Sequence, residues 1–307
     1  MLRDFDVYAY GVISSSTLHL LSHPFPPPEG YAEIAQTYSM TGGEALNSAI
    51  VLSRLGLRVI LDGNWLGDTS DGKRLLKKIQ HYGIDTRRLK LKKGYSGVQE
   101  IVFSDGQGRT IFGNYLDLLS TKRKWNIPRK ADLARAQIVC VDPPFQTESA
   151  LVGEYATQLG MPFVSIDSPY HHALSTAAAA IIVSGEFRSR EYPQAVLSEL
   201  FSEYQARAQG LVVFTAGSEA VLYARKGEPA KWFKPYRIDV IDSAGAGDSF
   251  RAGVIYGMLK KWSDDKIIQY ASALAGMVCE RFPGVLSSPS QSEVARFIQG
   301  QEKAKQQ

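Results

Sequence analysis

A run of small residues between two aspartates is the part of the sequence best suited to chemistry. Between Asp242 and Asp248 stand, after one serine, the residues Ala244, Gly245, Ala246 and Gly247. Small and apolar residues at helical spacing follow directly. Such a turn exposes backbone N–H groups at the N-terminus of a helix, where partial positive charge favours an anion. The pattern therefore predicts an anion-binding turn.

The two aspartates are suited to different tasks. Asp248 falls in the first turn of the predicted helix, where a carboxylate beside a bound phosphate can accept the proton of an attacking hydroxyl. Asp242 can brace the loop or help to hold a cation. The same spacing also fits a tight turn followed by a helix-capping aspartate, and one short glycine motif does not separate the two interpretations.

The elements that must position these residues follow from the hydrophobic pattern. Strands are predicted over residues 7–13, 57–61, 138–141, 162–166, 180–183 and 211–215. Helices are predicted over residues 42–56, 68–83, 148–160, 193–208, 247–261, 263–281 and 292–298. Repeated strand–helix units imply an α/β fold in which helices cover both faces of a mostly parallel sheet.

Two regions break this alternation. Strands near residues 12–40 surround a proline-rich stretch, and residues 96–115 form a hairpin around Asp105-Gly106-Gln107-Gly108. We predict that both belong to a small accessory sheet, a lid. A second antiparallel excursion is expected over residues 221–224 and 231–235. Without repeats or long linkers, residues 1–307 are predicted to form one domain.

Composition narrows the class of protein. The chain of 307 residues is 44% hydrophobic, enough for a large core, and its formal charge is only +4 with scattered basic residues. Cys140 and Cys279 lie in apolar stretches and fit a reducing compartment better than a disulfide. No signal peptide or membrane-length apolar run is found. We expect a soluble, cytoplasmic protein without nucleic-acid or membrane partners.

Two segments resemble the signatures of the ribokinase (PfkB) family of carbohydrate kinases. Residues 242–253 resemble its C-terminal signature, and residues 41–50, followed by Arg54-Leu55-Gly56 and Gly67-Asp68, resemble its N-terminal diglycine region. The resemblance covers almost the whole chain. It implies a ribokinase-like three-layer fold with a β-sheet lid, and transfer of the γ-phosphate of ATP to a hydroxyl of a small sugar, sugar acid or cyclitol.

The resemblance also implies roles for residues. Asp248 matches the catalytic base, and Ala244, Gly245, Ala246 and Gly247 match the anion hole for the transferring phosphoryl group. Gly42, Gly43 and Asn47 match positions lining the sugar site, and Asp142, at a strand end, matches an acidic residue near the sugar. Asp242 matches a loop that holds a monovalent cation in the family. The resemblance therefore implies ATP and Mg²⁺ as cofactors and dependence on potassium.

The residues predicted to bind the nucleotide match the family pattern less closely. Thr215, Gly217 and Ser218 match a segment that lies along the nucleotide, Ser184 belongs to the same side, and Ser272 and the region of Gly284 fall where the adenine pocket closes. Each of these residues also fits an ordinary turn or helix packing.

Several departures from the family pattern matter. Ser16 stands where the family commonly has an aspartate that grips sugar hydroxyls, so this grip is altered or shifted to Ser14 or Ser15. The stretch 184–188 lacks both residues of an Asn-x-x-Glu motif that organises magnesium, which leaves the metal to the nucleotide phosphates and water. Glu186 fits a solvent-facing loop better than a substitute ligand.

Other readings stay open. Arg109, at the hairpin tip, is either a lid residue over the substrate or solvated, and His171-His172 reads as loop surface because no metal-ligand pattern accompanies it. A nucleoside kinase and a non-catalytic ligand-binding paralogue remain alternatives. A dinucleotide-dependent oxidoreductase fits less well, because no Gly-x-Gly-x-x-Gly follows the first strand. By analogy with relatives, a homodimer through the lid is expected.

Overall fold

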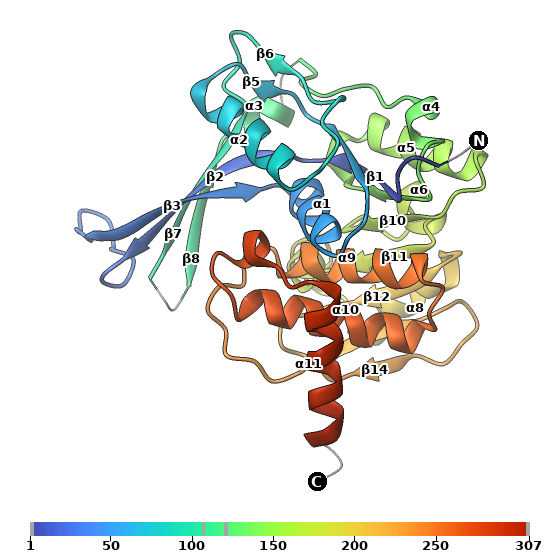
Figure 1. Ribbon diagram of the computed structural model, residues 1–307. Helices are drawn as coiled ribbons and strands as arrows, with labels where there is room; N and C mark the ends of the chain where they lie inside the picture. The colour runs from blue at the N-terminus through green and yellow to red at the C-terminus, as the bar shows by residue number, and fades with distance from the viewer. Residues whose placement is uncertain (1–2, 106–107, 120–121, 305–307) are drawn as a thin grey trace.

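A large sheet runs through the body of the protein and a smaller sheet projects from it (Figure 1). The computed structural model describes residues 3–105, 108–119 and 122–304. The eight strands of the large sheet lie in the order β14-β13-β12-β11-β10-β9-β1-β4. Their bounds are β1 Val7–Gly11, β4 Val59–Gly63, β9 Ile138–Val141, β10 Phe163–Ile166, β11 Ala180–Val183, β12 Leu211–Phe214, β13 Val221–Ala224 and β14 Lys231–Phe233. All pairings are parallel except those of β12 with β13 and of β13 with β14.

Alternation along β1 explains why both faces of the sheet carry helices. All five of its residues are buried, but Val7 and Ala9 join one hydrophobic core while Tyr8 and Tyr10 join the other. Successive side chains of a strand point to opposite faces, so an all-apolar strand needs cover on each side. This confirms the predicted three-layer α/β architecture.

Each core has its own set of helices. The core that contains Val7 is covered by α1 Glu44–Arg54, α2 Ser70–His81, α9 Ala246–Leu259, α10 Asp264–Cys279 and α11 Gln291–Ala304. The core that contains Tyr8 is covered by α3 Tyr115–Leu119, α4 Lys130–Leu133, α5 Thr147–Gln158, α6 Ala173–Thr176, α7 Gly185–Glu191 and α8 Leu197–Arg207. Two 3₁₀ turns, η1 Pro143–Phe145 and η2 Gly284–Ser287, and the short strands β5 Leu66–Gly67 and β6 Leu91–Lys92 complete the chain.

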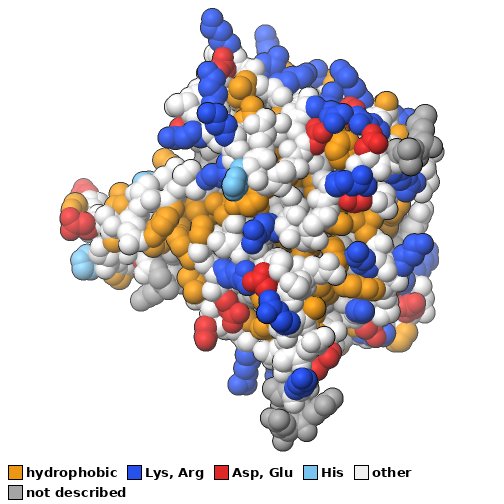
Figure 2. Space-filling model, viewed as in Figure 1, with side chains coloured by type: hydrophobic (Ala, Val, Ile, Leu, Met, Phe, Trp, Pro, Cys, Tyr) orange, Lys and Arg blue, Asp and Glu red, His pale blue; other side chains and the backbone are white. Residues whose placement is uncertain are grey.

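The projecting sheet is the expected lid. Its strands lie in the order β3-β2-β7-β8, with β2 at Ser14–Leu21, β3 at Ile34–Gly42, β7 at Val98–Ser104 and β8 at Arg109–Gly113. The hairpin is antiparallel, whereas β2 and β7 are parallel. Residues 106–107 of the predicted turn lie outside the described residues. Hydrophobic side chains are visible along the lid and where it joins the body (Figure 2).

Several predicted boundaries were wrong; the strand predicted over residues 57–61, for example, is β4 at Val59–Gly63. The first strand ends at Gly11 instead of residue 13, because the chain passes into lid strand β2 at Ser14. Helix α8 starts at Leu197, after a turn, instead of at Pro193. Helix α11 runs to Ala304, well past residue 298. None of the described helices is long and apolar enough to cross a membrane.

Candidate active site

The predicted site residues gather at the carboxyl ends of the parallel strands. Asp142 directly follows β9, Ser184 follows β11 and Thr215 follows β12. Open α/β sheets bind ligands outside these strand ends. The first turns of α9 lie at the same edge, because Arg251 of α9 forms a salt bridge with Asp142. Asp248, in the first turn of α9, is hydrogen-bonded to Asn47 of α1.

The turn before α9 depends on Gly245. This residue adopts a left-handed conformation with φ of 76°, and a Cβ added there would lie 2.2 Å from Cγ2 of Val285. Only glycine takes this conformation without strain and also leaves room for Val285. The helix already begins at Ala246, so Ala246 and Gly247 belong to its first turn. A Cβ added at Gly247 would meet no atom within 4 Å, so the helix N-terminus is open there.

Asp248 is held by the diglycine region. Asn47 Nδ2 donates to Asp248 Oδ2 at 2.9 Å, and Thr41 Oγ1 donates to Asn47 Oδ1 at 3.2 Å. The hydroxyl of Ser48 donates to the backbone carbonyl of Asp248 at 3.1 Å. Because the amide of Asn47 is fixed by Thr41, its NH₂ group faces the carboxylate. The two sequence signatures therefore meet at one side chain.

The surroundings of Asp248 raise its pKa from 3.8 to about 6. Burial is the largest cause, and the charges of Asp142 and Glu100 act in the same direction. The guanidinium of Arg251 and the hydrogen bond from Asn47 oppose the shift by stabilising the ionised form. A carboxylate with a pKa near 6 is ionised at neutral pH and still has appreciable affinity for a proton, which suits a general base.

A buried ion pair lies close to Asp248. Arg251 and Asp142 form a salt bridge, and the side chains of both are 0% exposed. Arg251 also donates to Ser48 Oγ at 3.0 Å and to the backbone carbonyl of Glu44 at 2.6 Å. The second oxygen of Asp142 accepts from the backbone N–H of Val12 at 2.9 Å. Both oxygens of Asp142 thus have a protein donor, and the predicted contact of Asp142 with the sugar stays a prediction.

Two glutamates that sequence reasoning did not single out lie beside Asp248. Burial, together with the charges of Asp142 and Asp248, raises the pKa of Glu44 to about 8, and its buried Oε2 has no hydrogen-bond partner within the described part of the chain. Glu100 of β7 accepts hydrogen bonds from Ser14 Oγ, at 3.0 Å, and from the hydroxyl of Tyr115.

The two adjacent glycines make room for these contacts. A Cβ added at Gly42 would lie 2.2 Å from Glu100 Oε2 and 2.4 Å from Ser14 Oγ. Gly43 has φ of 85°, and a Cβ there would lie 2.3 Å from the carbonyl oxygen of Val12. Of the residues predicted to bind the sugar, Ser14, Gly42, Gly43 and Asn47 thus come together. Ser16 is buried at 6% exposure and pairs with Glu100 across the lid sheet.

Asp242 has one oxygen satisfied and one free. Its Oδ1 accepts from the N–H of Ala244 at 2.9 Å, and this contact braces the loop. Its Oδ2 is buried and has no hydrogen-bond partner among the residues that the structure describes, and a Cβ added at Gly284 would lie 3.6 Å from it. A buried carboxylate oxygen without a donor can take a cation as its partner, and the monovalent-cation site stays a prediction.

Ser184, which was predicted to bind the nucleotide, forms hydrogen bonds with other protein groups. Its N–H and its hydroxyl both donate to Asp167, at 2.7 and 2.9 Å, and its Oγ accepts from Phe187 N to cap α7. Asp167 follows β10, has φ of 42°, and has its pKa raised chiefly by burial. Sequence reasoning missed it, because a lone aspartate after a strand carries no motif. Glu186 is exposed in the first turn of α7, as its solvent-facing interpretation requires.

The other nucleotide-side predictions separate into two groups. Gly217 and Ser218 are in the loop after β12, where the carbonyl of Thr215 accepts from Arg188 at 3.0 Å. Ser272 instead lies in α10 at 7% exposure, and its buried hydroxyl has no hydrogen-bond partner among the residues described. Its neighbour Ala271 packs so closely on α9 that a Cβ added at Gly253 would lie 2.6 Å from Ala271 Cα.

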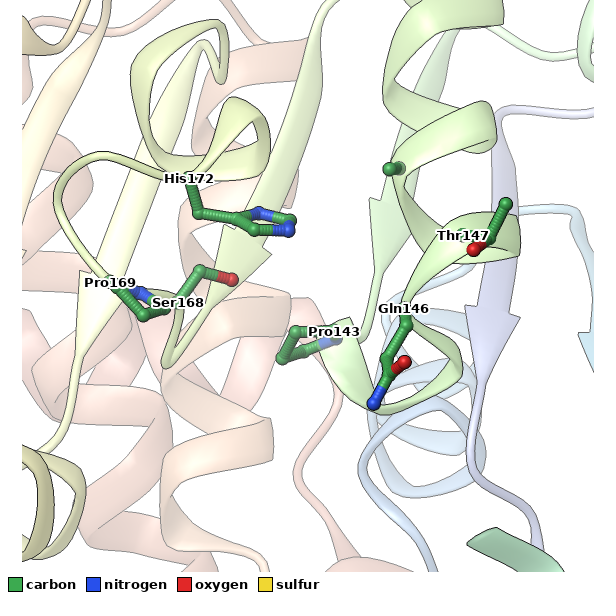
Figure 3. Close-up of a pocket in the computed structure, with 7 residues that line it drawn as sticks. Pro143, Gln146, Thr147, Ser168, Pro169 and His172 are labelled. Carbon is green, nitrogen blue, oxygen red and sulfur yellow. The ribbon is translucent and has the colours of Figure 1, made fainter. Parts of the chain in front are cut away.

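A separate cavity of about 410 Å³ lies at the same edge of the sheet. Pro143, Gln146 and Thr147 line one side, and Ser168, Pro169 and His172 line the other (Figure 3). It contains neither Asp248 nor the 244–247 turn. His172 is only partly exposed and accepts from Leu174 N at the start of α6, so of the histidine pair only His171 is the exposed loop residue that was expected. Within the described ranges, no group of three or more acidic, histidine or cysteine side chains is placed to hold a metal.

Comparison with known proteins decides the family. The sequence profile of the pfkB family of carbohydrate kinases matches residues 17–291. The chain belongs to this family. This confirms the resemblance of the two signatures, which the structure joins at Asp248, and identifies the protein as a kinase.

Known members of the family resemble the kinase along nearly its full length. A ribokinase from Haemophilus influenzae is 22% identical over 294 residues, which cover 92% of this chain and 95% of the relative. A nucleoside kinase from Methanothermobacter thermautotrophicus is 27% identical over 290 residues, 91% of each chain. The structure of Arabidopsis thaliana ribokinase complexed with ribose and ATP superposes with a TM-score of 0.79 at 16% identity, covering 97% of this chain and 99% of that one. The fold is therefore ribokinase-like.

Proposed function

We propose that the kinase transfers the γ-phosphate of ATP to a hydroxyl group of a small sugar, sugar acid or cyclitol, with Asp248 as general base. The observation that carries the proposal is the placement of Asp248. It stands in the first turn of α9, behind an open helix N-terminus, with a pKa of about 6 and with Asn47 fixing one carboxylate oxygen. A hydroxyl brought to the other oxygen can lose its proton as it attacks the phosphorus.

In this mechanism the chain contributes positioning and fixed dipoles. In the 244–247 turn, the N–H groups of Gly245 and Gly247 would face the transferring phosphoryl group and stabilise the charge that develops on it, since the N–H groups of Ala244 and Ala246 donate to Asp242 and to the carbonyl of Ser243. The open surface at Gly247 and the bracing of the loop by Asp242 fit that role. The lid would close over the acceptor and keep water from competing for the phosphoryl group.

Metal ions would assist from the nucleotide side. Mg²⁺ bound with ATP would supply charge neutralisation on the phosphates, and this chain offers the carboxylates of Asp167, directly after β10, and of Asp242, in the loop before α9. The unpartnered oxygen of Asp242 is the atom that would hold a monovalent cation. Removing potassium should then lower turnover, and Asp242→Asn should weaken that dependence.

Release of ADP with MgATP and potassium tests the function across sugars, sugar acids, cyclitols and nucleosides. A signal that depends on the acceptor and is lost in Asp248→Asn supports the proposal. Silence across the panel, from a protein that binds ATP or a sugar, would favour the non-catalytic paralogue, which the loss of the Asn-x-x-Glu motif keeps in consideration.

A nucleoside kinase is the second candidate, and the lid gives it specific support. Val102 and Ile111 pair on the same face of the lid as Glu100, and Ile111 is 52% exposed. The ring of Tyr38, on the edge strand β3, packs edge-to-face against the ring of Phe282, with 4.5 Å between the ring centroids. Apolar and aromatic surface above the sugar site suits a base, so nucleosides belong in the panel.

A homodimer through the lid is also proposed. Ile101 and Phe112 pair on the face opposite Glu100 and are 45% and 52% exposed, and exposed apolar surface of this kind favours association. Sedimentation of Ile101→Lys beside the wild type tests it, and a dimer that persists unchanged counts against this interface. We further propose a cytoplasmic location, because ATP is the donor and the two cysteines are buried and unpaired.

A further inference from the structure

Glu100 brings a second ionisable group to the predicted acceptor site. Its Oε1 is satisfied by Ser14 and Tyr115. Its Oε2 has no donor among the residues that the structure describes, and it lies so close to Gly42 that an added Cβ would approach to 2.2 Å. The diglycine segment at Gly42 leads directly into α1, whose Asn47 holds Asp248. The free oxygen of Glu100 therefore lies beside the segment that positions the base.

The carboxylate of Asp248 adds to this negative charge. Glu100 and Asp248 are close enough for the charge of Glu100 to help raise the pKa of Asp248. Glu44, the first residue of α1, has a pKa raised to about 8, so it is largely neutral at pH 7 and adds little charge. At this end of the site, Glu100 and Asp248 thus each retain an oxygen that no described protein donor satisfies.

The cation that acts on these groups is itself engaged by the protein. Arg251 is the cation that acts on both Asp248 and Glu44, and its side chain is 0% exposed. Its donors are taken by Asp142, by Ser48 and by the backbone carbonyl of Glu44. A negatively charged ligand would need a free guanidinium or ammonium group here, and Arg251 cannot turn toward it without leaving Asp142 unpaired in the interior.

We propose that the acceptor is an uncharged polyol that presents two hydroxyl groups to this end of the site, one to Asp248 and one to Glu100, and that Glu100 excludes acceptors carrying a carboxylate or phosphate there. An ionised carboxylate only accepts hydrogen bonds, so it selects ligand atoms that donate. An anionic group in the same place meets like charge in a partly dry site, which is strongly unfavourable. The inference rests on the proposed phosphotransfer at Asp248 and narrows its substrate from sugars and sugar acids to neutral polyols, the sugar moiety of a nucleoside included.

Matched ligands test the charge selection directly. Each set shares one carbon skeleton: a sugar with its aldonic acid and its monophosphate, and a nucleoside with its nucleoside monophosphate. Binding is measured by calorimetry with a non-hydrolysable ATP analogue and Mg²⁺, and turnover by ADP release. We expect the neutral member of at least one set to bind at least about tenfold more tightly than its charged counterparts.

Glu100→Gln is the informative variant, because it removes the charge and keeps the shape. It should reduce the preference for the neutral member by about tenfold, whereas a purely structural role for Glu100 would weaken all members alike. Glu33→Gln is the matched control, since Glu33 is an exposed lid residue just before β3. It should leave the ratio unchanged.

The outcomes separate the inference from the function on which it rests. ADP release that favours an acid or a phosphate overturns the inference alone, as does an unchanged ratio in Glu100→Gln or an equal change in Glu33→Gln. Binding of neutral polyols without ADP release contradicts phosphotransfer, while the binding ratio still decides the charge selection. Failure of every neutral member to bind also overturns the inference.

Discussion

Arg251 of α9 and Asp142, at the end of β9, form an ion pair in which both side chains are fully buried. The pair ties the helix that carries Asp248 to the central sheet. Two further contacts of Arg251, to Ser48 and to the carbonyl of Glu44, extend the tie to α1. Both helices that position the base are thereby fixed to one guanidinium group.

Breaking this pair should be costly. Arg251→Met leaves the Asp142 carboxylate buried without its partner, and we expect a loss of about 3–5 kcal/mol in the free energy of unfolding. Urea denaturation measures it, with Arg225→Met as the control, because Arg225 forms a partly exposed pair with Asp264 that should contribute about 1 kcal/mol or less. Adding Asp142→Leu to Arg251→Met should recover much of the loss. Equal losses for Arg251→Met and Arg225→Met would show that the buried pair is not a structural tie.

Asp248→Asn tests the base. The amide keeps the size of the side chain but cannot take the proton of the attacking hydroxyl, so kcat should fall by about 100-fold or more while ATP binding is retained. Steady-state ADP release and nucleotide titration measure the two effects. Turnover near that of the wild type would remove Asp248 from the catalytic role.

The pH dependence of turnover should report the same group. Because the base must be ionised, kcat should rise as the pH passes through about 6 and then level off. Asn47→Ala removes a hydrogen bond that stabilises the ionised form, so the midpoint should move to higher pH. A pH profile of kcat for both proteins measures the shift. A midpoint that does not move would mean that Asn47 does not tune Asp248.

The stability of the fold should respond to the same titration. The folded pKa of Asp248, about 6, is above its ordinary value of 3.8, so the folded state disfavours the charged form. This penalty is absent below pH 3.8, grows as the pH rises from 3.8 to 6, and is complete above 6. Asp248→Asn should therefore raise the midpoint of thermal unfolding more above pH 6 than at acidic pH. An equal effect at both would contradict the raised pKa.

The sequence predicted the layers of the fold and the centre of the site because both depend on local patterns. The apolar run at Val7 predicted a strand, the repeated strand–helix units predicted helices on both faces of the sheet, and the glycine turn placed Asp248 correctly in the first turn of a helix. The end of β1 was placed too late because Val12 and Ile13, which link β1 to the lid, are also apolar and buried.

The partners of the base could not be predicted, since they come from distant parts of the chain. Arg251 has the spacing of an ordinary helix residue, and only the packing of α9 against the sheet reveals that it is buried. Asp142 was placed at the right strand end, but its pairing with Arg251 was not predicted. Glu100 looks like a polar residue on a hairpin, and its approach to Ser14 depends on the parallel pairing of β2 and β7.

Gly42→Ala tests whether the space beside Glu100 matters for the acceptor. The new Cβ would lie 2.2 Å from Glu100 Oε2 and 2.4 Å from Ser14 Oγ, so both side chains must move. We expect kcat/KM for the acceptor to fall by about tenfold or more, as misplacement of a binding group implies, with little change in the KM for ATP. Gly300→Ala is the control, because a Cβ at Gly300 in α11 meets nothing within 4 Å and should only stabilise the helix, by about 1 kcal/mol. If Gly42→Ala and Gly300→Ala give the same acceptor kinetics, Glu100 and Ser14 do not border the acceptor.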